Sequence, residues 1–237
     1  MISFREEFTE IFASLGLDKY TEGDYPKRFE ILYEKLVETN KVMNLTALTE
    51  QRQVILGHFA DSLMALPKIK EGAKVIDVGC GGGFPTIPLA IARPDISLTA
   101  LDSTAKKLGF VADMAKLLDL DVTTLPMRAE DASKMPEYRE KFDVCVSRAV
   151  ARLNILDEIC LPFVKKGGTF VAMKGADADA EYLEAKKGIS LLGGELEAFD
   201  KINIDELGAR ALVVVKKALD TPAKYPRAYE KIKKTPL

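Results

Sequence analysis

A glycine-rich segment between two apolar runs is the feature that most constrains this chain. From Val75 to Ile91 the sequence reads VIDVGCGGGFPTIPLAI, with four glycines within the five positions 79–83. The apolar run before the glycines is typical of a buried strand, and the run after them is typical of a helix. A glycine turn after the first strand of a parallel sheet lets a ligand approach the backbone closely. We therefore expect a ligand site at this turn.

The sequence after Gly72 alternates between strand-like and helical segments. Strands are expected at 73–79, 97–102, 122–127, 142–147 and 169–174. Helices are expected at 87–92, 106–118, 155–164 and 177–192. Two last strands, 193–202 and 210–217, have no helix between them, so one of them is expected to be antiparallel. The pattern predicts an α/β fold, with a mostly parallel seven-stranded sheet and helices on both faces.

The first seventy residues have a different pattern, that of amphipathic helices. Ser3 and Glu6 form a capping-box pattern ahead of an apolar stripe that stops at Gly16. A second apolar stripe covers 25–36, and a third helix is expected from about 49 to 66. The chain is thus expected to consist of an N-terminal helical extension, 1–70, packed on an α/β domain, 71–237.

The composition is that of an ordinary globular protein and excludes several classes. The 237 residues are 47% hydrophobic and 30% charged, and no apolar run is long enough to span a membrane. The first residues include acidic side chains where a signal peptide carries basic ones, so a cytoplasmic protein is expected. Three cysteines without metal-ligand spacing and a single histidine predict reduced thiols and no metal site.

Two common ligands of glycine turns do not fit this one. A P-loop ends in Gly-Lys-Ser/Thr, whereas this turn ends in Gly83-Phe84-Pro85. A dinucleotide-binding turn requires a glycine where Phe84 stands. The spacing Asp77-x-Gly79-x-Gly81-x-Gly83 instead resembles motif I of the class I (Rossmann-like) methyltransferases, which use S-adenosyl-L-methionine. A carboxylate beside the turn suits the cationic amino-acid end of that cofactor, and the bare backbone admits its bulk.

Two further segments extend the expected cofactor site. Asp102 ends the second expected strand, 23 residues after Gly79, where a carboxylate can bind both hydroxyls of a ribose. The alternative for Asp102 is an ordinary strand-end turn residue. The segment MRAED, 127–131, follows the third strand, where the edge of an adenine would be recognised.

The methyl acceptor is constrained by motifs that the sequence lacks. An Asn/Asp-Pro-Pro-aromatic motif, typical of methylation at exocyclic amines, does not occur. None of the cysteines Cys80, Cys145 and Cys160 stands in the setting of the nucleophile that pyrimidine C5 methylation needs. We therefore expect an acceptor atom that already carries a free lone pair, and a reaction driven mostly by alignment of the reacting atoms.

A series of motifs then resembles one family along nearly the whole chain from Asn40. The motifs are NKVMNLTALTE (40–50), HFADSL (58–63), DVGCGGGFPTIPLAI (77–91), LDSTAKK (101–107), RAED (128–131), SRAVARL (147–153), MKG (173–175) and YPRAYEKIKKTPL (225–237). Together they resemble the RsmG family, also called GidB, of bacterial 16S ribosomal RNA guanine-N7 methyltransferases. One departure is Thr86, where the family usually has a small glycine.

The resemblance implies a substrate and a set of cofactor contacts. The substrate would be a guanine in the 530 loop of 16S ribosomal RNA, offered as RNA or as the small ribosomal subunit, and no protein partner is evident. The family's cofactor contacts correspond to Gly79, Phe84, Ala129, Glu130 and Arg148. Arg148 is also the candidate for positioning the reactants, although a surface cation at a strand end is the alternative.

A basic C-terminal tail supplies candidates for RNA binding. Residues 216–237 hold seven basic and two acidic residues, a net charge of +5, while the whole chain carries −2. The candidates are Lys174, Arg227, Lys231, Lys233 and Lys234, with a merely solvated tail as the alternative. His58 and Asn44 are open between binding and structural roles. Two other functions stay open: methylation of another RNA or a small molecule, and a non-catalytic protein that binds the cofactor and docks on the ribosome.

Overall fold

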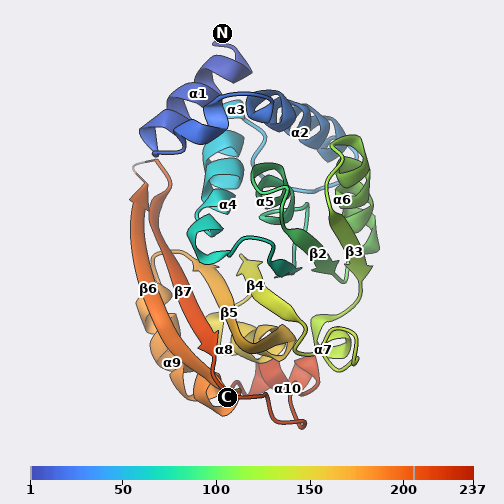
Figure 1. Cartoon of the computed structure of the whole chain (residues 1–237), viewed down its shortest axis with the longest axis vertical. Helices are drawn as coiled ribbons and strands as arrows, with labels where there is room; N and C mark the ends of the chain where they lie inside the picture. The colour runs from blue at the N-terminus through green and yellow to red at the C-terminus, as the bar shows by residue number, and fades with distance from the viewer. Residues whose placement is uncertain (1, 205) are drawn as a thin grey trace.

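The computed structural model describes residues 2–204 and 206–237, which form one seven-stranded sheet between two layers of helices (Figure 1). The strands are β1 (Lys74–Val78), β2 (Ser97–Asp102), β3 (Val122–Pro126), β4 (Phe142–Arg148), β5 (Val164–Lys174), β6 (Gly194–Ile204) and β7 (Gly208–Lys217). Their order is β3-β2-β1-β4-β5-β7-β6. β7 runs antiparallel to both β5 and β6, and the pairs among β1 to β5 are parallel. The expected sheet is confirmed.

The α-helices of the described residues range from 3 to 16 residues in length. They are α1 (Phe4–Ser14), α2 (Tyr25–Asn40), α3 (Gln51–Val54), α4 (Asp61–Leu63), α5 (Thr86–Ala92), α6 (Ala105–Leu117), α7 (Ala129–Ala132), α8 (Leu153–Cys160), α9 (Ala178–Leu191) and α10 (Tyr229–Lys234). A π-helix, η2 (Ile55–Ala60), joins α3 to α4, and short 3₁₀ turns occur at η1 (Asp18–Thr21), η3 (Leu66–Lys68) and η4 (Leu161–Phe163). Among the described residues, no helix is long and apolar enough to cross a membrane.

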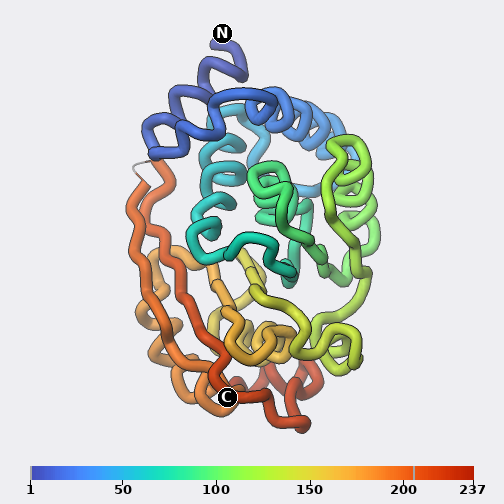
Figure 2. The backbone as a smooth tube through the Cα atoms, in the orientation of Figure 1, coloured from blue at the N-terminus to red at the C-terminus, as the bar shows by residue number. Residues whose placement is uncertain are grey.

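The alternation of side chains along the strands divides the core into two layers. Val75 and Val144 face a cluster that contains the helices α1 to α6, whereas their neighbours Ile76 and Cys145 face a cluster with α7 to α10. The N-terminal helices therefore share one apolar core with α5 and α6. The two ends of the chain lie at opposite ends of the long axis (Figure 2).

The N-terminal helices follow the sequence pattern closely. The hydroxyl of Ser3 accepts a hydrogen bond from the amide of Glu6, and the Glu6 carboxylate accepts one from the amide of Ser3, so the capping box is confirmed. Phe8, Phe12 and Phe29 are fully buried; Phe8 stacks on Phe12, and Phe29 packs against both rings at a tilt or edge-on. The third expected helix is present, but η2 interrupts it, as π-turns do near functional sites.

The largest differences from the sequence prediction lie at the start of β5 and in the C-terminal tail. β5 begins at Val164, where a helix was expected to end, because Val164 pairs with Phe142 before the register shifts along β4. The helix before it, α8, already ends at Cys160. The C-terminal tail is also ordered, since Tyr229–Lys234 form the helix α10.

Candidate functional site

A cavity of about 400 Å³ opens at the carboxyl ends of the central strands β1, β2 and β4. This edge of an open parallel sheet is where such folds bind ligands, and the volume is in the range of small-molecule sites. The expected site residues that line it are Gly79, Gly81, Phe84, Asp102, Ala129, Glu130 and Arg148. The structure therefore brings together segments that lie up to 69 positions apart in the chain.

The glycine turn gives the cavity a bare backbone wall. Gly79 has φ +79°, and a Cβ there would lie 2.3 Å from Cγ2 of Val150. Gly81 has φ +53°, and a Cβ there would meet no protein atom within 4 Å, so it would take up space at the cavity wall. Glycine is thus required at Gly79 by close packing, and at Gly81 it leaves room for a ligand.

Asp77 lies beneath the turn and does not line the cavity. Its Oδ2 accepts hydrogen bonds from the hydroxyl of Thr86 at 2.6 Å and from the amide of Thr86 at 3.2 Å. Its Oδ1 is buried and has no hydrogen-bond partner among the described residues. Burial raises the pKa of Asp77 to about 7, although the hydrogen bonds from Thr86 oppose this. Gly83 also lies outside the cavity wall, packed on Ile87.

Asp102 joins the end of β2 to the glycine turn. Its Oδ2 accepts a hydrogen bond from the amide of Gly81 at 2.9 Å, and its Oδ1 accepts one from the amide of Thr104 at 2.8 Å. Each carboxylate oxygen retains a second lone pair. Since Asp102 also lines the cavity, its carboxylate can accept further hydrogen bonds from a diol.

Arg148, at the end of β4, is held by three partners on η2 and α4. Its Nη1 donates to the carbonyl of Gly57 at 2.8 Å and to Oδ2 of Asp61 at 2.7 Å, and its Nη2 contacts Nδ1 of His58 at 3.1 Å. The guanidinium also lies 5.7 Å from the ring centroid of Phe84. Its Nε is buried and has no hydrogen-bond partner among the described residues.

His58 completes this cluster. Its ring stacks on Phe84 with a centroid separation of 4.3 Å, and its Nε2 lies 2.6 Å from the hydroxyl oxygen of Thr46. Burial, and secondly the charge of Arg148, lowers the pKa of His58 to about 4. His58 is therefore neutral near pH 7.

A second cavity, of about 380 Å³, adjoins the first at this cluster. His58, Arg148 and Ala149 line both cavities. Ala149 has φ +55°, a left-handed conformation that is uncommon for a residue other than glycine and often marks a functional site. The remaining polar wall of the second cavity comes from Asp61, Lys174, Glu181 and Arg210.

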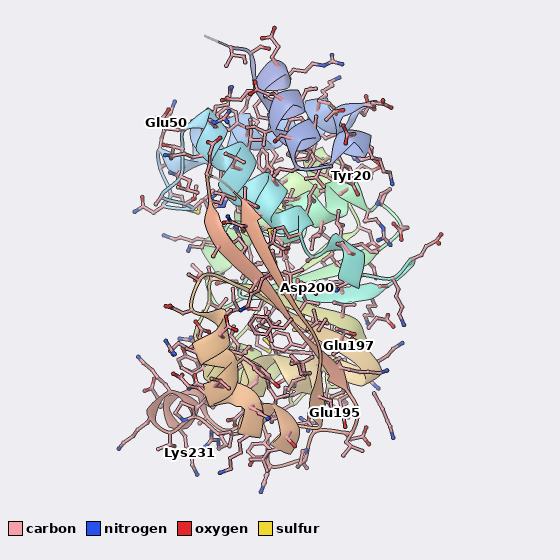
Figure 3. All side chains as sticks on the ribbon, turned by 90° about the vertical axis from the view of Figure 1, so that its left-hand side faces the viewer. Tyr20, Glu50, Glu195, Glu197, Asp200 and Lys231 are labelled. Carbon is pink, nitrogen blue, oxygen red and sulfur yellow. The ribbon has the colours of Figure 1, made fainter. Side chains whose placement is uncertain are left out.

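The RNA-binding candidates fall into two groups. The side chain of Lys174 is only 7% exposed and pairs with Glu181 at 2.6 Å, and Arg227 pairs with the fully buried Glu158 at 2.6 Å. Both cations therefore already have carboxylate partners within the fold. The exposed candidates are Lys231, Lys233 and Lys234, all on α10. Figure 3 shows Lys231 near one end of the molecule, far from Tyr20 and Glu50.

Some site residues carry no sequence signal. Glu181, Arg210 and Tyr229 line the cavities from distant parts of the chain, and nothing in their local sequence marks them. His58 carries a weak signal, because it is a polar residue within an apolar helix. Near the site, the side chain of Asn40 rather than that of Asn44 holds the turn, since its Oδ1 accepts hydrogen bonds from the amides of residues 45 and 46.

Comparisons with known proteins agree with this geometry. The family model GidB, rRNA small subunit methyltransferase G, matches residues 26–212. The chain is 45% identical over 237 residues to ribosomal RNA small subunit methyltransferase G of Lactobacillus johnsonii, covering 96% of this chain and 99% of that one. It is 44% identical over 207 residues to the protein of the same name from Desulfitobacterium hafniense, covering 86% of each chain.

Solved structures support the fold alone. A crystal structure of a putative rRNA-methylase from Clostridium thermocellum superposes with a TM-score of 0.50 at 19% identity, over 70% of this chain and 96% of that one. The structure of geranyl diphosphate methyltransferase in complex with SAM superposes with a TM-score of 0.51 at 12% identity, over 67% and 84%. These likenesses support the same fold over about two thirds of this chain.

Proposed function

Since the chain belongs to the GidB family of rRNA small subunit methyltransferase G, we propose that it methylates N7 of a guanine in the 530 loop of 16S ribosomal RNA with S-adenosyl-L-methionine. The observation that carries this proposal is the pair of cavities that meet at Arg148 and Ala149. A methyl donor in one cavity and a purine in the other would face each other across these residues. Such alignment can supply much of the rate enhancement in group transfer.

The first cavity suits the cofactor. The carboxylate of Asp102 would accept hydrogen bonds from the two ribose hydroxyls, and the segment from Ala129 to Glu130 would border the adenine. The bare backbone at Gly79 and Gly81 would admit the amino-acid end of the cofactor. The carboxylate of Asp77, beneath the turn, would attract the positive charge of that end. When bound, the cofactor supplies a methyl group on a positively charged sulfur.

The second cavity suits the acceptor. Its volume of about 380 Å³ exceeds that of a purine base, and its polar wall combines carboxylates with guanidinium and ammonium groups that can hydrogen-bond to a base edge. Guanine N7 has an unprotonated lone pair at neutral pH, so no general base is needed. His58 is not free to act as a general base, because its two ring nitrogens are already in contact with Arg148 and Thr46.

The chain's own residues would then position the reactants and exclude water. Phe84 is buried and stacks on His58, so the two rings form an apolar wall beside Arg148. Asp61 neutralises the guanidinium of Arg148 and pairs with Arg210 at 2.9 Å. The buried Cys80 and Cys145 have raised pKa values because of burial, which disfavours the thiolate that a covalent mechanism would require.

The experiment that tests this function offers several acceptors to the purified protein with methyl-labelled cofactor. Small ribosomal subunits, protein-free 16S ribosomal RNA and a reaction without RNA are compared. We expect label in RNA from at least one of the first two reactions, and none in RNA when Arg148→Lys replaces the wild type. Label transferred only to small molecules would contradict the proposal. Cofactor binding without any transfer would instead support the non-catalytic docking protein.

A further inference from the structure

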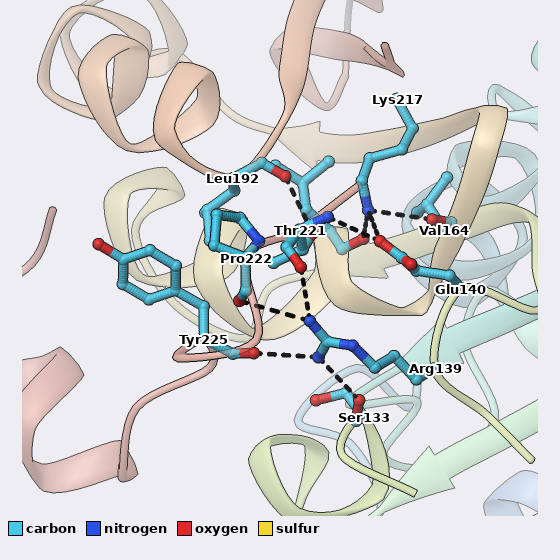
Figure 4. A network of polar contacts seen from close by, with 10 residues as sticks. Ser133, Arg139, Glu140, Val164, Leu192, Lys217, Thr221, Pro222 and Tyr225 are labelled. Carbon is cyan, nitrogen blue, oxygen red and sulfur yellow. Dashed lines mark hydrogen bonds and ion pairs between the residues drawn. The ribbon is translucent and has the colours of Figure 1, made fainter. Parts of the chain in front are cut away.

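The C-terminal segment is fixed to the body of the protein by specific polar contacts. The guanidinium of Arg139 donates to the carbonyls of Thr221 at 2.8 Å and Tyr225 at 3.0 Å (Figure 4). The carboxylate of Glu140 accepts a hydrogen bond from the amide of Thr221 at 2.7 Å and pairs with the buried Lys217 at 3.0 Å. The path of the chain from β7 to α10 is therefore defined by contacts with the body of the protein.

The start of α10 is anchored on α8. The backbone amide of Arg227 donates to Glu158 at 2.8 Å, and its guanidinium donates to both oxygens of the same carboxylate. Ile232 of α10 is fully buried in the cluster that also contains Ile159 of α8. Since Ile159 lines the first cavity, α10 is fixed to an element that forms part of the cavity wall.

Tyr229, the first residue of α10, reaches the cavity itself. It lines the first cavity together with the segment from Met127 to Glu130, the part expected to border the adenine. The guanidinium of Arg128 lies 5.9 Å from the centroid of the Tyr229 ring, a cation–π arrangement that orients the ring. An aromatic ring with a neighbouring guanidinium is a suitable boundary for a planar heterocycle.

The other side of α10 faces solvent and is basic. Lys231, Lys233 and Lys234 are exposed, and Glu230 is the helix's one acidic residue. A surface of this charge suits the phosphates of a nucleic acid. The short helix α10 thus contributes Tyr229 to the wall of the first cavity and presents three exposed lysines to solvent.

We propose that Tyr229 makes α10 part of the cofactor site, so that cofactor binding and RNA binding by the α10 lysines are energetically coupled. The inference rests on the proposed function, because it takes the cofactor and ribosomal RNA as the two ligands. Arg227 and Ile232 anchor α10 on α8, and a ligand in contact with Tyr229 and Arg128 adds a restraint at its first turn, so RNA that binds the exposed lysines loses less conformational freedom. Linkage requires each ligand to strengthen the binding of the other by the same factor.

The first test measures the cofactor site without RNA. Calorimetry with S-adenosylhomocysteine, which cannot transfer a methyl group, compares the wild type with Tyr229→Ala and Tyr229→Phe. We expect about a five- to twentyfold loss of affinity for Tyr229→Ala, and less than a twofold change for Tyr229→Phe, because the ring is retained. Tyr182→Ala, which removes a ring packed on Phe199 outside both cavities, is the matched control and should bind like the wild type.

The second test measures the coupling. In the wild type, S-adenosylhomocysteine should tighten binding of 16S ribosomal RNA about three- to tenfold and should slow hydrogen exchange in 229–234. Tyr229→Ala should abolish both effects. Replacing Lys231, Lys233 and Lys234 together by alanine should weaken RNA binding and lower its salt dependence by roughly two to three phosphate contacts, while affinity for S-adenosylhomocysteine alone stays unchanged.

The outcomes separate this inference from the proposed function. If the wild type binds S-adenosylhomocysteine and methylates RNA while Tyr229→Ala binds it equally well, the role of Tyr229 is wrong and the function stands. Equal coupling in the wild type and in Tyr229→Ala would likewise overturn the inference. If the wild type does not bind S-adenosylhomocysteine at all, both proposals fail.

Discussion

The guanidinium of Arg148 donates a hydrogen bond to Nδ1 of His58 over 3.1 Å. A guanidinium has no acceptor, so Nδ1 must accept and the ring must carry its proton on Nε2. That proton is donated to the hydroxyl oxygen of Thr46 at 2.6 Å. Burial and the adjacent Arg148 lower the pKa of His58 to about 4, so the ring is neutral near pH 7. The two hydrogen bonds then select the tautomer that carries its proton on Nε2.

The first prediction concerns His58 as a positioning residue for Arg148. His58→Ala leaves a donor of Arg148 without its partner, at a cost of about 1.5–3 kcal/mol, which corresponds to a loss of at least about tenfold in single-turnover rate at saturating cofactor. His58→Asn, whose amide oxygen can stand near the position of Nδ1, should recover part of the rate. An unchanged rate in His58→Ala, or no recovery in His58→Asn, would argue against this role.

The second prediction concerns Asp102 and the ribose. Asp102→Ala removes a carboxylate that lines the cavity, so cofactor affinity should fall by about 1.5–3 kcal/mol. Calorimetry with S-adenosylmethionine on a variant with unchanged circular dichroism is the measurement. Asp102→Asn, which keeps one oxygen as acceptor, should lose less. Wild-type affinity in a folded Asp102→Ala would remove this residue from the cofactor site.

The third prediction concerns the pH dependence of cofactor binding. Burial raises the pKa of Asp77 from its ordinary range to about 7, so its carboxyl is mostly neutral below pH 6 and mostly ionised above pH 8. Because the cofactor is cationic, it should prefer the ionised form, and its affinity should rise between pH 6 and pH 8. Thr86→Val removes the hydroxyl that donates to Asp77 and should shift this rise to higher pH.

Calorimetric titrations from pH 6 to pH 8.5 check the role of Asp77. Asp77→Asn is the control, because it cannot ionise and its cofactor affinity should not vary with pH through this residue. At saturating cofactor, the single-turnover rate should be nearly flat from pH 6 to pH 8.5, since guanine N7 needs no base. A wild-type affinity that does not change with pH would contradict the coupling of Asp77 to the bound charge.

The fourth prediction concerns stability and Asp157. Burial raises the pKa of this carboxyl to about 8, and its Oδ2 has no hydrogen-bond partner among the described residues. The folded protein therefore retains a proton that the unfolded chain loses at much lower pH, so the free energy of unfolding should fall as pH rises from about 4 to 8. The slope from this group is roughly 1.4 kcal/mol per pH unit.

Urea unfolding at pH 6 and pH 9 tests the role of Asp157. Asp157→Asn lacks the titrating group, so its free energy of unfolding should fall less than that of the wild type between the two values. Glu158→Gln provides a contrast, because it weakens the ion pair with Arg227 and should destabilise the protein at both pH values. Equal pH dependence in the wild type and Asp157→Asn would show that Asp157 does not titrate in this range.

The sequence predicted the sheet and the glycine turn because both depend on local patterns. The spacing of Gly79 and Gly81, and the position of Asp102 at a strand end, follow directly from the alternation of strand and helix. The start of β5 was missed because Lys165, Lys166 and two glycines obscure the apolar pattern after Val164. A strand whose first residues are charged gives little periodic signal.

The partners of charged residues could not be predicted in the same way. Lys174 carries the same local signal whether it pairs with Glu181 or faces solvent, and only the packing of α9 on the sheet decides between the two. The place of Tyr229 in the cavity wall likewise depends on the anchoring of α10 through Arg227. These contacts join residues far apart in the chain, and no local pattern in the sequence predicts them.

The central claim is that this chain places a methyl group on guanine N7 in the 530 loop, and nucleoside analysis of labelled RNA tests it most directly. Small ribosomal subunits and 16S ribosomal RNA that lack the modification are incubated with the protein and methyl-labelled S-adenosylmethionine, digested, and mapped by mass spectrometry. The account predicts label in 7-methylguanosine at a single position within the 530 loop. Label on an exocyclic amine, on a ring carbon or outside the 530 loop would contradict it.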